Sequence, residues 1–478
     1  MTANAEACDI VIVYPPVVRT GRYSQVATGH EIPPQPLINL GAVLRQRGFK
    51  VRLLDANALG LTPEETTRRI LGWSPRFVGI TAPTMLISTA GRIAKAVKDS
   101  APDIVTIVGG PHLTAVPKET MESYPGVDIG VIGEGENTIL ELLQSIERKS
   151  PLDGVKGIIY RGSSGPRRTP PRPFIQDLDT LPFPAWDMLP DLLERYQQSA
   201  ARIGRLPNVS IITSRGCPFQ CIFCNRTVFG NVTRAHSADY VMRMIRRLIE
   251  RYRIKSISFE DDNFVVFRKR LVDLCERLVS EGVDIVWDCA SNVNAVQPEI
   301  LALMRKAGCW QINYGIESGS QRILDFIRKG TTLKKIQEAL AMTRAAGINT
   351  KGYFIIGHPT ETLESIQETI DFVKRIDLDI FQMSFMVPFP GTELHAMADR
   401  YGSFAKELDH MHIWTPQFIP HGLSKETMEK ESMRAYREFY FRPRPIYGYL
   451  KRSLRPSVAA KFVKDGLRIL RFLLGNSG

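Results

Sequence analysis

Cysteine and long apolar runs are scarce in this chain. Its 478 residues include seven cysteines, too few for a disulfide framework, which indicates a reducing compartment. No stretch of 18 or more apolar residues occurs, so we expect no membrane-spanning helix. Residues 1–6 carry an acid where a signal peptide has basic residues. These absences predict a cytoplasmic protein, and the length predicts two or three domains.

Three of the cysteines lie together on one short segment. Cys217, Cys221 and Cys224 form a C-x3-C-x2-C array directly after an apolar, strand-like stretch, residues 209–212. A [4Fe-4S] cube normally takes four cysteines, so a loop with three leaves one iron open to a ligand that is not protein. Two alternatives are three buried structural thiols and a zinc site. Zinc in a structural site needs a fourth ligand, and the nearest downstream histidine, His236, is on an unrelated polar stretch.

The cysteine spacing, the preceding strand and Phe223 before the last cysteine resemble the radical S-adenosylmethionine (radical SAM) superfamily. The resemblance implies that the open iron chelates the amino and carboxylate groups of SAM, and that the reduced cluster cleaves SAM to methionine and a 5′-deoxyadenosyl radical. It also implies a partial (β/α)6 barrel. Six strand-like segments indeed recur, separated by amphipathic helical stretches, at residues 209–213, 256–260, 285–288, 311–316, 350–356 and 381–387.

The ends of these segments supply candidate SAM ligands, because barrel enzymes keep their chemistry at the carboxyl ends of the strands. Carboxylates there suit an ammonium group, although a solvated turn with a helix N-cap gives the same pattern. Asn292 occupies a place where related sequences often have arginine, which weakens the expectation of a SAM carboxylate contact there. By resemblance, the SAM-binding residues are Phe223, Glu260, Asp261, Glu317, Ser318, Ile355 and Gly357.

Residues 1–150 alternate strand-like and helical patterns, which predicts a parallel sheet covered on both faces. Ligands of such open sheets bind beyond the carboxyl ends of the strands. The segments there resemble the Rossmann-like (flavodoxin-like) cobalamin-binding domain of one radical SAM branch, and the alternative is a vestigial domain without a cofactor. The D-x-H-x-x-G signature is absent, so no cobalt ligand is predicted and the lower corrin face is expected against residues 81–85. The implied cobalamin-binding residues are Tyr14, Pro15, Thr81, Thr84, Gly109, Gly110, His112, Gly133, Glu134 and Gly135.

The remaining chain has two further regions. We expect a proline-rich connector over residues 151–208, the barrel over 209–390 and a helical, basic region over 391–478. Residues 442–478 hold nine Lys and Arg against one acid. The predicted helix over 456–474 has an apolar row on one face and Lys461, Lys464, Arg468 and Arg471 on the opposite face. Such a helix either lies in a membrane interface or docks on the barrel. No nucleic-acid partner is expected, because the basic segment has few aromatics and no known binding module.

The resemblance as a whole implies an α/β enzyme that uses a [4Fe-4S] cluster, SAM and cobalamin. Its leading activity is methyl transfer to an unactivated carbon or phosphorus of a small-molecule or lipid-like substrate, with an electron donor such as flavodoxin or ferredoxin. One alternative is an oxidative cyclase or ring-rearranging enzyme that resembles tetrapyrrole cyclases, and another is a non-catalytic cobalamin or redox sensor. A tRNA methylthiotransferase would need a second N-terminal cysteine triad, and only Cys8 lies there. Cys275, Cys289 and Cys309 are expected to be buried hydrophobic residues.

Overall fold

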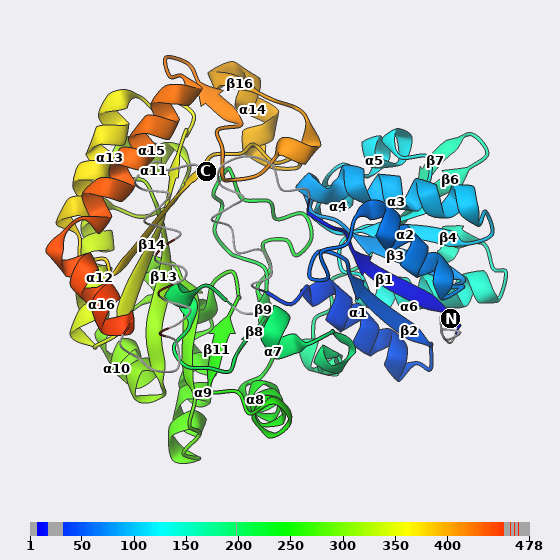
Figure 1. The fold of residues 1–478 in the computed structure, drawn as a ribbon, viewed down its shortest axis with the longest axis horizontal. Coiled ribbons are helices and arrows are strands. Elements are labelled where there is room, and N and C mark those ends of the chain that lie inside the picture. The colour runs from blue at the N-terminus through cyan, green and yellow to red at the C-terminus, as the bar shows by residue number, and fades with distance from the viewer. Residues whose placement is uncertain are drawn as a thin grey trace.

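The computed structural model describes residues 7–17, 32–196, 198–453, 459, 463 and 467. Figure 1 shows two lobes side by side, an N-terminal lobe in blue and cyan and a second lobe in green to orange. Each lobe has a mainly parallel sheet with helices packed against it. The predicted α/β class is therefore confirmed, with the sheet of each lobe built from the strand-like segments of the sequence.

The N-terminal sheet has the strand order β2-β1-β3-β4-β5-β6-β7. Its first five strands run parallel, and all but the edge strand β2 are largely buried. Helices α1 (Gln35–Gln46) and α6 (Glu136–Glu147) cover one face, and α2 (Pro63–Gly72) and α3 (Ile87–Ser100) cover the other. The parallel strands are β1 (Ile10–Tyr14), β2 (Val51–Asp55), β3 (Phe77–Thr81), β4 (Val105–Gly109) and β5 (Ile129–Val131).

The N-terminal sheet continues beyond residue 150 into the segment expected to be a connector. β6 (Ile158–Gly162) pairs antiparallel with β5, and β7 (Gly165–Arg168) pairs antiparallel with β6. Ile158 and Ile159 are buried, so they extend the hydrophobic core. Pro166 lies on the edge strand β7, where its missing N–H leaves no ladder bond unmade.

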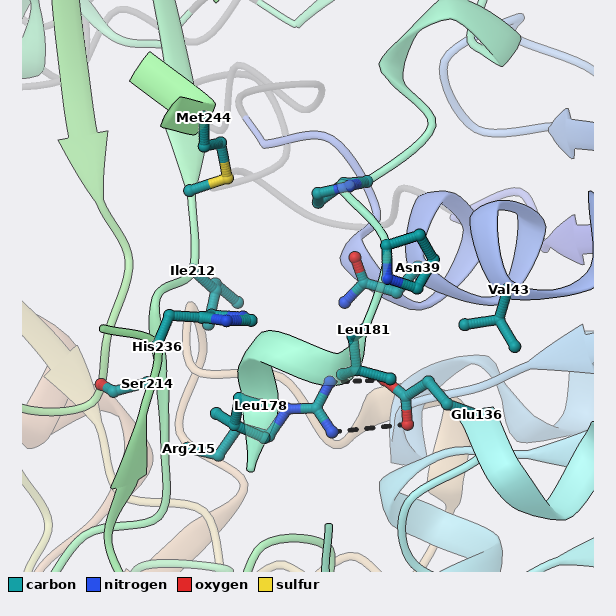
Figure 2. A pocket seen from close by; sticks show the side chains of 12 residues that line it. Asn39, Val43, Glu136, Leu178, Leu181, Ile212, Ser214, Arg215, His236 and Met244 are labelled. Carbon is teal, nitrogen blue, oxygen red and sulfur yellow. Dashed lines mark hydrogen bonds and ion pairs between the residues drawn. The ribbon is translucent and has the colours of Figure 1, made fainter. Parts of the chain in front are cut away.

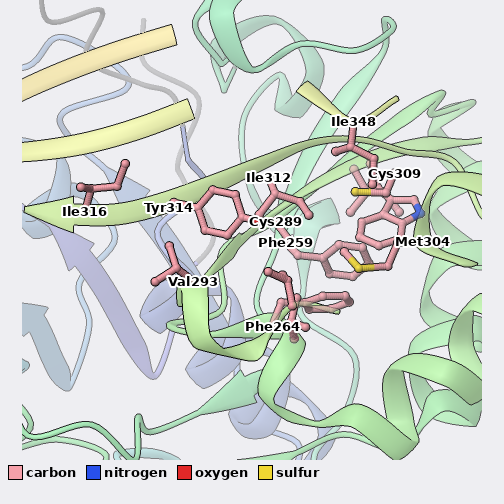
Figure 3. Packing of buried hydrophobic residues seen from close by; sticks show 14 of the residues in the cluster. Phe259, Phe264, Cys289, Val293, Met304, Cys309, Ile312, Tyr314, Ile316 and Ile348 are labelled. Carbon is pink, nitrogen blue, oxygen red and sulfur yellow. The ribbon is translucent and has the colours of Figure 1, made fainter. Parts of the chain in front are cut away.

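The second lobe has six parallel strands in the order β15-β14-β13-β12-β11-β8, which confirms the predicted partial barrel. Its outer face is apolar. Figure 3 shows Cys289, Cys309 and Ile312 packed there with aromatic side chains. Cys275, Cys289 and Cys309 are completely buried, as predicted. The strands are β8 (Asn208–Ile211), β11 (Ser256–Phe259), β12 (Val286–Ser291), β13 (Cys309–Glu317), β14 (Asn349–Ile356) and β15 (Ile380–Phe385).

The inner face of this half-barrel is polar. Asp288 accepts hydrogen bonds from Ser258 at 2.5 Å and from Asn313 at 2.9 Å. Arg202, from the segment before β8, reaches the same carboxylate at 3.1 Å and Glu260 at 2.9 Å. Burial alone would lower the pKa of Arg202, but the two carboxylates raise it above its ordinary value. Because every charge of this network has a partner, polar groups can fill the lower barrel without a large desolvation cost.

The C-terminal region completes the second lobe. Helix α15 (Lys425–Tyr440) packs on β15, the edge strand of the half-barrel. The Tyr436 hydroxyl accepts from the Met383 N–H at 3.0 Å, and the Tyr440 hydroxyl donates to the Phe381 carbonyl at 2.7 Å. These bonds occupy backbone groups that an open edge would leave unpaired.

The C-terminal region has three further elements before the predicted tail helix. They are α14 (Glu393–Tyr401), the hairpin of β16 (Gly402–Phe404) and β17 (Phe418–Pro420), and α16 (Pro443–Ser453). Most of the predicted helix over 456–474, including Lys461, Lys464, Arg468 and Arg471, lies outside the described residues. Ala459, Val463 and Leu467 are described as helical, with Val463 and Leu467 about half exposed. No helix within the described ranges is long and apolar enough to cross a membrane.

Candidate active site

The three cysteines lie on a loop that is closed at its base. β9 (Ser214–Arg215) pairs antiparallel with β10 (Arg234–Ala235), with Arg215 opposite Arg234. Residues 216–233 between them carry Cys217, Cys221 and Cys224. Gly216 begins the loop at φ 83°, and a Cβ there would lie 2.5 Å from the Val232 carbonyl oxygen. Only glycine allows this conformation and this close approach of the two loop ends.

The tip of the cysteine loop is hydrogen-bonded to the barrel lobe. The Ile222 N–H donates to the Ile327 carbonyl at 3.2 Å, and the Leu394 N–H donates to the Ile222 carbonyl at 3.0 Å. The Asn225 side chain donates to the Pro390 carbonyl at 3.0 Å. These partners follow β13 and β15, so the loop lies against the carboxyl-end segments of the barrel.

The thiols differ in exposure and in electrostatic environment. Cys221 is buried, Cys217 is partly buried and Cys224 is exposed. The interaction between the two thiols lowers the pKa of Cys221 and raises the pKa of Cys224. Burial raises the pKa of Cys217. A lowered pKa favours the thiolate form of Cys221, which is the form that binds metal.

The donor set fits a cluster better than a single ion. Within the described residues, no three His, Cys, Asp or Glu side chains converge as they would around one metal ion. A [4Fe-4S] cube takes each thiolate on a different iron, so its ligands need not converge in that way. Three thiols on one loop match such a cube with one open iron.

A buried ion pair, Glu317 with Lys329, lies beside the thiols. Glu317 ends β13 at a register shift and has φ 69°, a strained backbone conformation that re-aims its side chain. Lys329 Nζ donates to Glu317 Oε1 at 2.7 Å, and both side chains are about 10% exposed. The positive charge of Lys329 acts on Cys221 and Cys224. Sequence reasoning missed Lys329, because nothing in Arg328-Lys329-Gly330 distinguishes it from a surface lysine.

The two carboxylates at the end of β11 have protein partners. Glu260 binds Arg202 through both oxygens, at 2.9 and 3.1 Å. Asp261 is 2% exposed and accepts hydrogen bonds from the Thr213 N–H at 3.1 Å and from the Ser214 hydroxyl. Asp261 thus anchors the chain just before the cysteine loop. These bonds do not test whether Glu260 and Asp261 contact SAM, so both contacts stay predictions.

The remaining predicted SAM residues lie around the ends of β13 and β14. Ser318 is buried and its hydroxyl lies 3.2 Å from that of Thr369. Phe223 and the buried His358 form an edge-on ring contact at 6.5 Å, and Ile355 is half-buried. Gly357, at φ 89°, donates its N–H to Glu361, as His358 does at 3.1 Å. Burial raises the pKa of Glu361 to about 7.

The predicted cobalamin residues gather at the carboxyl edge of the N-terminal sheet. His112 is buried, its Nδ1 lies 3.3 Å from the Thr84 hydroxyl, and burial lowers its pKa to about 4, so the ring is neutral. A Cβ on Gly110 would lie 2.9 Å from the Ala82 carbonyl, whereas one on Gly133 would meet nothing within 4 Å. The loop of Gly133 therefore faces open space. The other predicted residues there are Tyr14, Pro15, Thr81, Gly109 and Gly135.

Glu134, also predicted to contact cobalamin, has protein partners on both carboxylate oxygens. Its carboxylate accepts from Arg215 at 2.8 Å, from Arg234 at 2.8 Å and from the Ile175 N–H at 2.7 Å. Figure 2 shows the neighbouring Arg215–Glu136 pair at the side of a cleft between the lobes, about 440 Å³ including space open to solvent. With the Glu134 carboxylate occupied, its predicted cofactor contact stays untested.

Comparison with known proteins agrees with this architecture. The model of the Radical SAM superfamily matches residues 211–373, and that of the B12 binding domain matches residues 26–143. An uncharacterised methyltransferase of Pyrococcus horikoshii, PH0819, is 34% identical over 93% of this chain and 97% of its own length. The chain belongs to the cobalamin-binding radical SAM family. The anaerobic magnesium-protoporphyrin IX monomethyl ester cyclase of Rubrivivax gelatinosus is 27% identical over 91% of this chain and 81% of its own.

A solved structure shares the whole fold of this radical SAM enzyme. The radical SAM methyltransferase TsrM from Kitasatospora setae, solved with cobalamin and a [4Fe-4S] cluster, superposes with a TM-score of 0.68. The match has 17% sequence identity and covers 91% of this chain and 89% of that one. The predicted order, a B12-binding lobe followed by a radical SAM half-barrel, is confirmed. The predicted cofactors of the family, a [4Fe-4S] cluster, SAM and cobalamin, are confirmed by the same comparisons.

The buried Glu361 predicts a pH-dependent stability. Its folded pKa of about 7 exceeds the ordinary 4.5, so between these values the unfolded chain loses the proton first. Stability therefore falls as pH rises from about 4.5 to about 7, by up to about 3 kcal/mol. Glu361→Gln keeps an acceptor for the two N–H donors but cannot ionise, and should gain stability over the wild type across this range. Urea unfolding at about pH 4.5 and about pH 7.5 measures the difference, because roughly these values bracket the titration.

The matched control is Glu364→Gln, whose carboxylate lies in the exposed first turn of α13 (Leu363–Arg375). The pKa of Glu364 lies below 4.5, so Glu364→Gln should keep the pH dependence of the wild type, which Glu361 causes. An equal pH dependence in the wild type and in Glu361→Gln would show that Glu361 does not titrate in this range.

Proposed function

We propose that this radical SAM enzyme is a cobalamin-dependent methyltransferase that acts on an unactivated carbon or phosphorus of a small molecule. The observation that carries the proposal is that the cysteine loop is bonded to the barrel at its tip and to the predicted cobalamin lobe at its base. The relative with the higher identity, 34%, is named a methyltransferase, and the cyclase relative is 27% identical. The higher identity of the methyltransferase relative favours methyl transfer over cyclisation.

Three thiolates, Cys217, Cys221 and Cys224, would hold the cluster, and the loops of Thr84, Gly110 and Gly133 would hold cobalamin. When bound, these groups supply the electron for SAM cleavage and the methyl group for transfer. Neutral His112 is held by Thr84 rather than free to move. No cobalt ligation by His112 is proposed, in keeping with the absent D-x-H-x-x-G signature.

The ion pair of Glu317 and Lys329 is suited to the polar end of SAM. Lys329 brings a buried cation to the thiols, and Glu317 Oε1 already accepts from it. The Lys329 ammonium has three N–H donors, so it can donate to a carboxylate of SAM as well as to Glu317. Glu317 Oε2 is then available to an ammonium. Lys329 thus supplies the positive charge that Asn292 cannot.

The cysteine assignment is tested by single alanine variants. Replacing Cys217, Cys221 or Cys224 by Ala removes one iron ligand, and we expect loss of the iron–sulfur chromophore and of 5′-deoxyadenosine production from SAM. Iron and sulfide analysis of anaerobically reconstituted protein measures the first effect. Hydroxocobalamin binding should persist in the same variants, because its predicted site is in the other lobe. Deoxyadenosine formation by a triple-alanine variant would rule out the assignment, and an absence of bound cobalamin in the wild type would rule out the cobalamin part.

The Lys329 assignment is tested by SAM affinity. Lys329→Met removes a charged hydrogen bond worth about 1.5–3 kcal/mol, so the Kd for SAM should rise on the order of 10- to 100-fold. Calorimetry on cluster-loaded protein measures it. The double variant Lys329→Met with Glu317→Gln avoids leaving a buried carboxylate unpaired. Arg328→Met is the control, because Arg328 pairs with Glu393 at the exposed surface at 2.7 Å. An unchanged Kd in both Lys329 variants contradicts the assignment.

A second candidate function is oxidative cyclisation, favoured by the cyclase relative. Product analysis distinguishes the two, because methyl transfer replaces one hydrogen of the substrate by CH₃, whereas a cyclised product has lost hydrogen.

We further propose two partners. A small acidic electron carrier, flavodoxin or ferredoxin, would approach the side of the loop on which Cys224 is exposed, and cluster reduction by such a carrier tests this.

The second partner is an anionic membrane surface or lipid-like substrate, bound by the tail. Phe441, Ile446 and Tyr447 are exposed at the start of this tail, and the nine basic residues of 442–478 complement anionic headgroups.

The tail proposal predicts salt-sensitive binding to vesicles. Each basic residue near an anionic surface contributes about 1 kcal/mol, and salt screens this attraction. Full-length protein should sediment with anionic vesicles at low salt, and less with neutral vesicles or at high salt. A protein that ends at Phe441 should not sediment. Equal behaviour of the two folded proteins would show that the tail helix only docks on the barrel. Cytoplasmic localisation stays a prediction.

A further inference from the structure

The two residues at the base of the cysteine loop, where the chain enters and leaves it, contact the same carboxylate of the N-terminal lobe. Arg215 and Arg234 are opposite each other in the β9–β10 pair that closes the loop. Arg215 Nη1 and Arg234 Nη1 each lie 2.8 Å from Glu134 Oε1. Glu134 belongs to the loop after β5, at the ligand-facing edge of the N-terminal sheet. The base of the cluster loop is thus joined directly to the predicted cobalamin loop.

A second carboxylate completes this contact. Glu136 accepts from Arg215 Nη2 at 2.5 Å, so two arginines face two glutamates and their charges balance. All four side chains are between 4% and 7% exposed. We call these four residues, Glu134, Glu136, Arg215 and Arg234, the interlobe clamp.

Aromatic rings fix the planes of the two guanidinium groups. Arg234 lies over Phe174 of the connector, with its Cζ 4.6 Å from the ring centre, and Arg215 lies over Phe229 of the cysteine loop at 5.4 Å. Arg234 also donates to the Ile175 carbonyl at 2.8 Å. Stacking and forked hydrogen bonds both restrict a guanidinium in direction as well as distance.

The energetics of buried ion pairs indicate what such a clamp is suited to do. Desolvation offsets most of the attraction, so a buried ion pair adds little stability compared with apolar residues of the same volume. It does specify geometry, because a charged fork tolerates little displacement, whereas apolar surfaces can slide over one another. The clamp therefore contributes mainly to the placement of the two lobes.

We propose that the interlobe clamp consists of positioning residues that set the separation between the cluster and cobalamin. The tip of the loop is already fixed to the barrel by Ile222, and the clamp joins the N-terminal lobe to the base of the same loop. Other contacts of the N-terminal lobe, such as the hydrogen bond from Tyr196 to Asp55 at 2.9 Å and the packing of η9 (Leu408–His410) on η2 (Thr84–Leu86), involve residues outside that loop. The proposal rests on the proposed function, in that both groups must be bound. It goes further by assigning their spacing to four named side chains.

Pulsed electron paramagnetic resonance tests this spacing without any substrate. The full-length enzyme is loaded with cluster and cobalamin, and both are poised in their paramagnetic states. We expect a resolved dipolar splitting in the wild type, and loss of that splitting in Glu136→Gln and in Glu134→Gln. Iron and cobalamin contents are measured on every sample. Because Glu134→Gln removes the shared carboxylate and can fail to fold, Glu136→Gln, which leaves the Glu134 contacts in place, is the deciding variant.

Two controls separate positioning from stability. Asp284→Asn breaks an exposed pair with Arg205, at 2.5 and 2.9 Å, that lies within the barrel lobe, and should keep the splitting. The double variant Arg215→Met with Glu136→Leu keeps the site buried but removes the fork, and should lose the splitting even where its thermal midpoint equals that of the wild type. Wild-type splitting in Glu136→Gln or in the double variant would overturn the clamp proposal alone. A wild type without bound cobalamin would overturn the proposed function with it.

Discussion

The cysteine loop has to hold three thiols in place although it has no hydrophobic core of its own. Its order comes from contacts at both ends: a two-residue ladder at the base, between Arg215 and Arg234, and backbone bonds at the tip, at Ile222. Gly216 permits the base to close. Because one end of the loop is bonded to each lobe, the same contacts that order the thiols also relate the half-barrel to the B12-binding lobe.

The half-barrel imposes a second constraint, since its strands are apolar outside and polar inside. The lower part of the interior is filled by Arg202 with Asp288 and Glu260, all of them paired. Near the carboxyl ends of the strands, the pair of Glu317 and Lys329 places two opposite charges beside the thiols. The interior thus changes from a closed ionic network to a single pair of opposite charges, which suits the proposed binding of the amino acid end of SAM.

Local sequence patterns were enough to predict the strands and to identify the cysteine motif, because both are defined by residues close together in the sequence. The six barrel segments and the five parallel N-terminal strands follow from apolar periodicity, and Cys289 and Cys309 lie in the core as expected. What could not be predicted depends on distant partners. Arg215 is 81 residues from Glu134, and Arg202 is 58 residues from Glu260. No spacing rule links such pairs, and Lys329 carries no local sign of burial.

The carboxylates at the strand ends show why sequence alone left their roles open. An acid at the end of a strand gives the same pattern whether it meets a ligand ammonium or a protein arginine, and only the number of donors around it separates the two. Glu134 and Asp261 each receive donors on both oxygens, and Glu260 is bound by both arms of Arg202. Among the described contacts, Glu317 accepts a side-chain donor on Oε1 only. Its spare acceptor capacity, next to the thiols, makes Glu317 the carboxylate best placed to receive a ligand ammonium.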